Sequence, residues 1–278
     1  MNCKYILLFL IVSFSSVESI DFVLFTEPKT GTHFLIPILE ELTKKKVYWA
    51  PEFQKNETLS EYVEIASEDP NFFIFSLNQL AWNKKTMDQV WDIAINSRRF
   101  LHLHAPYSIP MENYMIEKKC INFFIKRDPR DQIVSLLNHY KYIHFNDKEV
   151  ELIPTDDERL LYMIKNQLRI NTINFRKWLT SSMCCVLNFE KLIGFQETKV
   201  PQADAMEEMR KMTAALQLET SDEHLIRIYE KHFGRGWSFF KGKSGVWRDY
   251  FNEEHKRAVK EEIGDLLIEW GYEENLDW

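Results

Sequence analysis

Short apolar runs alternate along the chain with longer segments in which apolar residues recur every three or four positions. The runs cover residues 22–25, 71–77, 100–106, 121–126 and 184–188, and their boundaries and composition predict strands. The last run is apolar almost throughout, which is typical of a strand in a parallel sheet that is covered on both faces.

The segments between these runs predict helices. Start signals support three of them: Asp128 before Pro129, Thr155 with Glu158, and Asn252. The predicted helices cover residues 34–42, 87–94, 129–140, 156–179, 203–216, 221–232 and the segment after residue 252. Strands that alternate with helices predict an α/β fold with a central, mostly parallel sheet flanked by helices. A chain of 278 residues fits one large domain of this kind, or at most two.

The first 19 residues have the pattern of a targeting segment. Lys4 is positive, residues 5–14 form an apolar run, and Val17 and Ser19 occupy the −3 and −1 positions of a cleavage site. We therefore expect a signal peptide at 1–19, a mature domain at 20–278, and entry into the secretory pathway or export. If the segment does not act as a leader, a cytoplasmic protein is expected. The run is short for a transmembrane helix, so membrane association is expected only through this leader.

Composition restricts the classes of function. The formal net charge of −7 argues against a general nucleic-acid-binding protein. The four cysteines show neither the pattern of a disulfide framework nor the spacing of metal ligands, so no metal site is expected. The sequence does not indicate an oligomeric state.

The clearest candidate chemistry follows the first predicted strand. Residues 28–32 read Pro-Lys-Thr-Gly-Thr and lead into a helix. A helix start offers backbone N–H groups without internal partners and the positive end of the helix dipole, and both favour an anion. Lys29 adds a full charge, Gly31 permits close approach, and the threonines add hydroxyl donors. The lysine precedes the glycine, which excludes a Walker A loop.

This loop resembles the 5′-phosphosulfate loop of sulfotransferases, which usually reads Pro-Lys-Ser-Gly-Thr-Thr-Trp-Leu. A second segment, residues 126–135, is similar to the 3′-phosphate motif of that family, in which arginine and then Asn-Pro-Lys-Asp lead to Val-Ser. Arg127 offers a forked, permanently charged donor, and Ser135 lies two helical turns further on. Asp128 and Arg130 replace the family's asparagine and lysine.

A third segment, Leu-His-Leu-His-Ala-Pro at residues 101–106, resembles the family's Lys-Thr-His-Leu-Pro, whose histidine is the general base. The resemblance implies that His104 removes the proton of an acceptor hydroxyl, which suits a side chain that titrates near neutrality. His104 ends a predicted parallel strand, where open α/β sheets bind their ligands. His102 takes the position of the family's lysine, so a cationic phosphate contact is expected to be weaker.

A fourth segment, residues 239–251, is similar to the family's Arg-Lys-Gly-x-x-Gly-Asp-Trp-Lys segment, which closes over the 3′-phosphate. The resemblance implies that Lys241 and Gly242 contact this phosphate. Phe240 stands where the family has arginine, and Val246 stands where it has aspartate.

Two aromatic residues complete the resemblance. Phe34 takes the place of the tryptophan that stacks on adenine, and a phenyl ring can also stack. Residues 186–194 resemble a family strand that ends in Arg-Tyr/Phe-Glu-Asp-Leu, which implies that Phe189 contacts the adenosine. The resemblance covers nearly the whole predicted mature chain and implies the P-loop-NTPase-like sulfotransferase fold.

The resemblance implies a sulfotransferase that moves a sulfuryl group from 3′-phosphoadenosine 5′-phosphosulfate (PAPS) to an acceptor hydroxyl or amine, without a metal. His104 and Lys29 are the implied catalytic residues, and Lys29 neutralises charge on the leaving phosphate. The residues implied to bind the nucleotide are Lys29, Thr30, Gly31, Thr32, His33, Phe34, Arg127, Ser135, Phe189, Lys241 and Gly242. The sequence does not distinguish a small-molecule acceptor from a glycan.

Two other functions remain open from the sequence. A kinase with an unusual phosphate loop would need an acidic magnesium ligand, for which Asp128 is the candidate. A non-catalytic, nucleotide-binding relative of the sulfotransferases is supported by the departures from the family pattern at His102, Phe240 and Val246.

Overall fold

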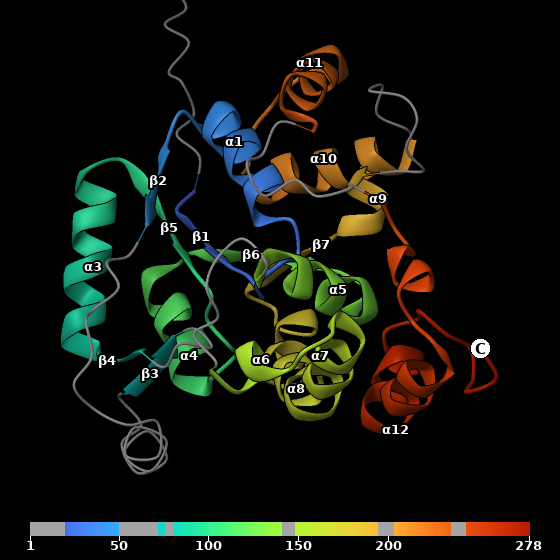
Figure 1. Ribbon diagram of the computed structural model, residues 1–278. Coiled ribbons are helices and arrows are strands. Elements are labelled where there is room, and N and C mark those ends of the chain that lie inside the picture. Colours follow the sequence, from blue (N-terminus) through green and yellow to red (C-terminus); the bar gives the residue numbers. More distant parts are fainter. Residues whose placement is uncertain (1–19, 50–71, 76–79, 141–147, 194–202, 235–242) are drawn as a thin grey trace, which may run out of the picture.

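A five-stranded sheet forms the centre of the computed structural model (Figure 1). The residues that the structure describes are 20–49, 72–75, 80–140, 148–193, 203–234 and 243–278. From one edge to the other, the strands are β2 (Lys46–Trp49), β5 (Arg99–Leu103), β1 (Phe22–Phe25), β6 (Ile121–Lys126) and β7 (Cys184–Asn188). All four pairings are parallel, which confirms the predicted parallel sheet.

The alternation of side chains along β1 separates two hydrophobic cores. Phe22 and Leu24 belong to one core, whereas Val23 and Phe25 belong to the other. The first core is covered by α1 (Thr32–Thr43), α9 (Phe189–Ile193), α10 (Ala203–Ala215) and α11 (Asp222–His232). The second is covered by α3 (Lys84–Asn96), α4 (Ile109–Lys118) and α8 (Arg169–Arg176). Helices therefore flank both faces, as predicted.

A third core lies beyond the β7 side of the sheet, where Figure 1 shows a group of helices. It is formed by α5 (Pro129–Tyr140), α7 (Asp156–Met163) and α12 (Glu253–Glu269), and α6 (Lys148–Leu152) precedes α7. The predicted helix 156–179 consists of α7, a π-helical segment Ile164–Leu168, α8, and a 3-10 turn Lys177–Leu179. Thr155 caps α7 by accepting the Glu158 N–H at 3.3 Å, which confirms that start signal.

Two of the predicted strands differ from expectation in their ends or partners. The run at residues 71–77 contains β3 (Phe72–Phe75), but this strand pairs antiparallel with β4 (Leu80–Asn83) in a separate two-stranded sheet. The run at 100–106 leaves the sheet after Leu103. Beyond that point the Ala105 carbonyl accepts the indole N–H of Trp178 at 3.0 Å, so it is bound by a side chain instead of a neighbouring strand.

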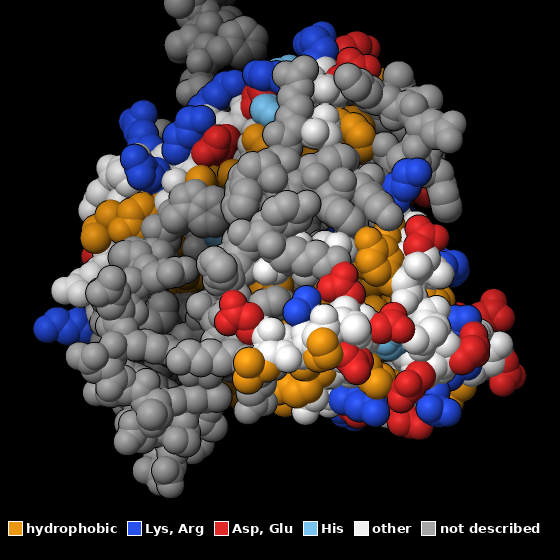
Figure 2. Space-filling view, in the orientation of Figure 1, with side chains coloured by type: hydrophobic (Ala, Val, Ile, Leu, Met, Phe, Trp, Pro, Cys, Tyr) orange, Lys and Arg blue, Asp and Glu red, His pale blue; other side chains and the backbone are white. Residues whose placement is uncertain are grey.

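The described surface is acidic near its C-terminal helices. Figure 2 shows red side chains at the lower right, where Figure 1 places α7 and α12. Exposed acidic residues of these helices include Asp156, Asp157, Glu158, Glu253 and Glu254. Among the described residues, none of the helices combines the length and the apolar character needed to cross a membrane.

Candidate active site

Four of the predicted site segments follow the carboxyl ends of four adjacent parallel strands. Lys29 follows β1, His104 follows β5, Arg127 follows β6, and Phe189 follows β7. The carboxyl ends of parallel strands in an open α/β sheet form the ligand-binding edge. The sheet therefore brings together segments that are far apart in the sequence.

The loop after β1 has a backbone shape that depends on its glycine. Gly31 is the N-cap residue of α1 and has a φ of 104°, in the left-handed region. A Cβ at this position would lie 2.6 Å from ring atoms of Phe189, so glycine is also required by the available space. The hydroxyl of Thr30 donates to the Glu27 carbonyl at 2.8 Å. These contacts fix the start of α1, where Thr32 and His33 supply the first backbone N–H groups.

Arg127 connects the loop to β6 and β7. Its Nη1 donates to the Lys29 carbonyl at 2.6 Å, and its guanidinium lies 4.3 Å from the centre of the Phe189 ring. Its Nε is buried and has no hydrogen-bond partner among the described residues. Burial lowers the pKa of Arg127, and the nearby carboxylates of Asp131 and Glu190 act in the opposite direction. A buried cation with an unused N–H donor is suited to an anionic ligand.

His104 has a defined tautomer. Its Nδ1 lies 2.9 Å from the backbone carbonyl of Thr26. A carbonyl can only accept, so Nδ1 carries the hydrogen and Nε2 is the basic nitrogen. Burial lowers the pKa of His104, the bond to Thr26 raises it, and the charge of Lys29 lowers it. A neutral imidazole with a free basic nitrogen is the form that a general base requires.

A chain of polar contacts joins His102 to the phosphate loop. The Thr26 hydroxyl lies 3.4 Å from His102 Nε2 and 2.8 Å from the Thr32 hydroxyl. Burial holds the pKa of His102 well below its ordinary value, and His104 lowers it further. His102 is therefore neutral near pH 7 and adds no positive charge at the family's lysine position.

Lys29 lies near several histidines whose pKa values are lowered mainly by burial and also by its charge. Burial and, to a smaller extent, the charge of Arg127 lower the pKa of Lys29 to about 8. Burial, Lys29 and His104 together lower the pKa of His33 to about 4. The pKa of His139, in the last turn of α5, is lowered by burial and by Lys29. The positive charge is thus concentrated on Lys29 and not shared with these imidazoles.

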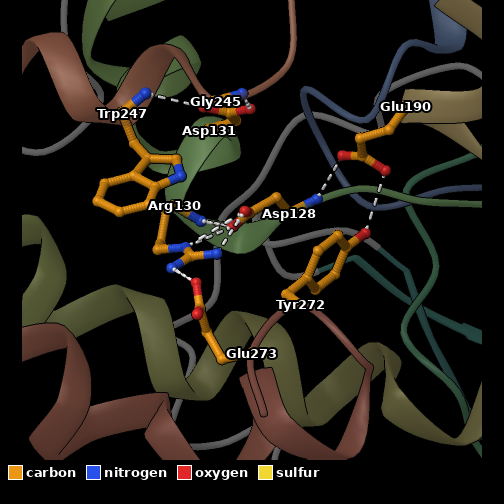
Figure 3. A network of polar contacts seen from close by, with 8 residues as sticks. All are labelled: Asp128, Arg130, Asp131, Glu190, Gly245, Trp247, Tyr272 and Glu273. Atoms are coloured by element: carbon orange, nitrogen blue, oxygen red, sulfur yellow. Dashed lines mark hydrogen bonds and ion pairs between the residues drawn. The ribbon is translucent and has the colours of Figure 1, made fainter. Parts of the chain in front are cut away.

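Asp131 ties α5 to the C-terminal turn of the candidate site (Figure 3). Its Oδ2 accepts the Gly245 N–H at 2.7 Å, and its Oδ1 accepts the Trp247 N–H at 2.9 Å. Gly245 belongs to the segment predicted to close over the 3′-phosphate. The two residues predicted to touch that phosphate, Lys241 and Gly242, lie outside the described residues.

The two departures from the family pattern near Arg127 pair with each other. Arg130 bonds Asp128 at 2.8 Å and also contacts Glu273, as Figure 3 shows. The guanidinium of Arg130 lies 4.2 Å from the Trp247 ring centre and 4.6 Å from that of Trp278. Only 2% of the Arg130 side chain is exposed, so this pair is part of the core. A kinase would need Asp128 to be available as a magnesium ligand. The Asp128 carboxylate is instead paired with Arg130.

Glu190 supports the start of α5 from the neighbouring segment. Its Oε1 accepts the Asp128 N–H at 2.9 Å, and its Oε2 accepts the Tyr272 hydroxyl at 3.2 Å (Figure 3). Burial raises the pKa of Glu190 to about 6. The contact links β6 and β7 directly beyond their paired ends, Lys126 and Asn188.

The remaining predicted residues lie in buried positions near this edge. Ser135 is in the second turn of α5. The Phe34 ring makes edge contacts with Tyr229 at 5.7 Å and Phe233 at 5.8 Å, between α1 and α11. Phe189 contacts Gly31 and Arg127, as described above. Their contacts with a nucleotide stay predictions.

Sequence reasoning missed several residues of the site. Glu27, Gln132, Asp131 and His139 were not predicted to take part. A glutamate two residues after a buried strand was a signal for Glu27, because a charge in that position needs a specific partner. Asp131 occupies the aspartate of the 3′-phosphate motif, but its partners on the C-terminal turn are 114 and 116 residues away.

Comparison with known proteins identifies the family. The sulfotransferase domain matches residues 19–181, which is more than half of the chain. The chain belongs to the sulfotransferase family and is an enzyme that transfers sulfuryl groups. The kinase and non-catalytic alternatives are not favoured.

Solved structures share the fold at low sequence identity. Mouse sulfotransferase SULT7A1 complexed with PAP is 16% identical, with a TM-score of 0.56 and coverage of 90% of this chain and 89% of that chain. Retinol dehydratase in complex with androsterone and inactive cofactor PAP is also 16% identical, with a TM-score of 0.56 and coverage of 89% and 80%. A comparison with curated proteins finds no match.

Proposed function

We propose that this sulfotransferase uses PAPS as its sulfuryl donor and a small molecule as its acceptor. The observation that carries the proposal is the bond between Arg127 and the Lys29 carbonyl. It sets a buried guanidinium with an unused N–H beside a loop lysine, at the start of a helix. Two adjacent cationic groups with helix-start amides match a nucleotide that carries phosphate at both its 5′ and 3′ positions.

Lys29 and the helix-start amides hold the 5′ side of this nucleotide. Charge grows on the 5′-phosphate oxygen when its bond to sulfur breaks, and Lys29 neutralises that charge. Lys29 and the amides are already in position before the reaction begins. They stabilise the transition state because they do not need to reorganise during the reaction. The PAP-bound structures with the same fold support a bisphosphate at this edge.

His104 activates the acceptor. Its Nε2 takes the proton of the acceptor hydroxyl or amine while the acceptor atom forms a bond to sulfur. The imidazolium that results is stabilised by the bond from Nδ1–H to the Thr26 carbonyl. The bond between sulfur and the 5′-phosphate oxygen breaks as the new bond forms, so the products are the sulfated acceptor, the 3′,5′-bisphosphate and the proton on His104.

Arg127, Ser135 and the turn held by Asp131 form the 3′ side. Asp131 fixes the N–H groups of Gly245 and Trp247. Lys241 and Gly242, which lie outside the described residues, are proposed to contact the 3′-phosphate as well. A site that binds the 3′-phosphate selects the bisphosphate over ordinary nucleotides.

The acceptor is proposed to be a small alcohol, phenol or amine. Retinol dehydratase, which shares the fold, has structures with androsterone and with retinol. Transfer of radiolabelled sulfate from PAPS to a panel of steroids, retinoids, phenols, amines and sugars tests both donor and acceptor class. Labelled product with any small molecule supports the proposal, and transfer to glycans alone contradicts the acceptor class.

Entry into the secretory pathway is proposed from residues 1–19, which lie outside the described residues. Sequencing the N-terminus of the protein expressed from its natural start codon tests this proposal. A first residue of Ile20 supports cleavage, and an intact leader contradicts it.

A further inference from the structure

Three consecutive carbonyls of the phosphate loop accept hydrogen bonds from side chains. Two of these carbonyls, those of Glu27 and Lys29, are described above. The third belongs to Pro28 and accepts the side-chain N–H of Gln132 at 2.7 Å. Gln132 lies on α5, so this bond joins the loop after β1 to the helix after β6.

The amide of Gln132 also bonds the side chain of Glu27. Both side chains are buried, with 4% of Glu27 and 7% of Gln132 exposed. Burial raises the pKa of Glu27 to about 8, so its carboxyl is protonated near pH 7. The pair therefore forms a neutral polar contact between the loop and α5.

The Pro28 carbonyl controls the conformation of the next residue. The carbonyl of Pro28 and the N–H of Lys29 belong to one planar peptide group. Fixing the direction of the carbonyl fixes the orientation of this peptide plane and thereby restrains ψ of Pro28 and φ of Lys29 together. This φ is 66°, in the left-handed region, which is unfavourable for a side chain with a Cβ and persists only where neighbouring contacts hold it.

We infer that Gln132 is a positioning residue, which holds the Pro28–Lys29 peptide against α5 and so keeps the Lys29 ammonium at the 5′ end of the donor site. The inference rests on the proposed function, because it assigns Lys29 to the 5′-phosphate. It involves no direct contact between Gln132 and the nucleotide. Its effect is therefore specific to ligands that carry a 5′-phosphate.

The test compares two nucleotides, 3′-phosphoadenosine 5′-phosphate and adenosine 3′-phosphate, by calorimetric titration of the full chain. In Gln132→Met, the affinity for the bisphosphate is expected to fall about tenfold, which is the upper end of the effect of one lost hydrogen bond between neutral groups. The affinity for adenosine 3′-phosphate is expected to stay within about twofold. The turnover number of the variant for sulfuryl transfer is expected to fall without a matching rise in the KM for the acceptor.

Asn138→Leu is the matched control. Asn138 is buried on the same helix and donates to the Val134 carbonyl at 2.9 Å and to the Tyr250 hydroxyl at 3.4 Å, away from the phosphate loop. This variant is expected to lower thermal stability without changing the ratio of the two affinities. Gln132→Asn, whose shorter amide does not span both partners, gives the same comparison if Gln132→Met does not fold.

Two results overturn the inference. One is that Gln132→Met and Gln132→Asn leave the ratio of the two nucleotide affinities unchanged because neither affinity changes. The other is that the affinities for both nucleotides fall by the same factor. Failure of the proposed function has a different signature, because the wild-type protein itself would then bind the bisphosphate no better than adenosine 3′-phosphate.

Discussion

His104 donates its Nδ1–H to the backbone carbonyl of Thr26 over 2.9 Å, and this single bond determines which ring nitrogen is basic. The carbonyl lies at the end of β1 and the imidazole at the end of β5, the strand beside it. The central strand of the sheet therefore carries the phosphate loop and also orients the proposed base.

Replacing His104 tests its role as that base. In His104→Gln, turnover is expected to fall about 100-fold or more, because the proton of the acceptor is no longer taken in the transition state. The affinity for the bisphosphate product is expected to change little. Steady-state kinetics and calorimetry on the same preparation measure both quantities. Turnover equal to that of the wild type would exclude His104 as the base.

Arg127 is expected to determine nucleotide affinity. In Arg127→Met, the affinity for the bisphosphate should fall at least about tenfold, since a charged donor is lost and the Lys29 carbonyl loses its partner. Arg176→Met is the matched control, because Arg176 is half exposed and pairs with Glu269 away from the site. If the two variants bind the bisphosphate equally well, Arg127 is not part of the nucleotide site.

The pH dependence of kcat/KM should report Lys29. Its pKa in the free enzyme is lowered to about 8, so its positive charge is present below that pH and lost as the pH rises through it. Activity is expected to decline above about pH 8. The pKa of His104 is lowered from its ordinary value, so the base stays neutral and active at lower pH than an ordinary histidine would.

The variant Lys29→Arg separates the titration of Lys29 from that of Glu27, whose pKa is also about 8. An arginine stays charged, so the decline in kcat/KM is expected to move to higher pH while the remaining activity is reduced. A decline that stays at the same pH in Lys29→Arg would assign it to another group.

Gly31 and Gly271 form a matched pair for testing the loop. Both have positive φ, at 104° and 74°, but only Gly31 has a neighbour in the way of a Cβ, the ring of Phe189. Gly271→Ala should cost about 1 kcal/mol of stability from backbone strain alone. Gly31→Ala should cost more and also weaken nucleotide binding. Denaturant unfolding and calorimetry measure these effects, and equal results for both variants would contradict the proposed packing.

The arrangement of the site along the sheet could be predicted from the sequence. Lys29, His104, Arg127 and Phe189 each follow an apolar run, and parallel strands place such residues at one edge. β2 was missed because its four residues begin with Lys46 directly after a lysine-rich helix end, where no turn residue marks a boundary. The elements β4, α4, α6 and α9 were also missed. The other strands and helices were indicated by their periodicity and start signals.

The contacts that hold the site in place could not be predicted. Gln132 reaches the Pro28 carbonyl across 104 residues of sequence, and Asp131 reaches the Gly245 amide across 114. Neither partner is marked by spacing or composition, because a backbone group accepts or donates whatever its side chain is. Asp128 and Arg130 read as departures from a ligand motif, whereas their pairing shows that they stabilise the core beside it.

The proposed donor site has separate places for a 5′- and a 3′-phosphate, and a calorimetric titration can establish whether both are present. The wild-type protein is titrated with 3′-phosphoadenosine 5′-phosphate and, separately, with ATP and magnesium. The bisphosphate is expected to bind at least about tenfold more tightly than ATP. Tighter binding of ATP, or magnesium-dependent ATP hydrolysis, would contradict the proposed donor site.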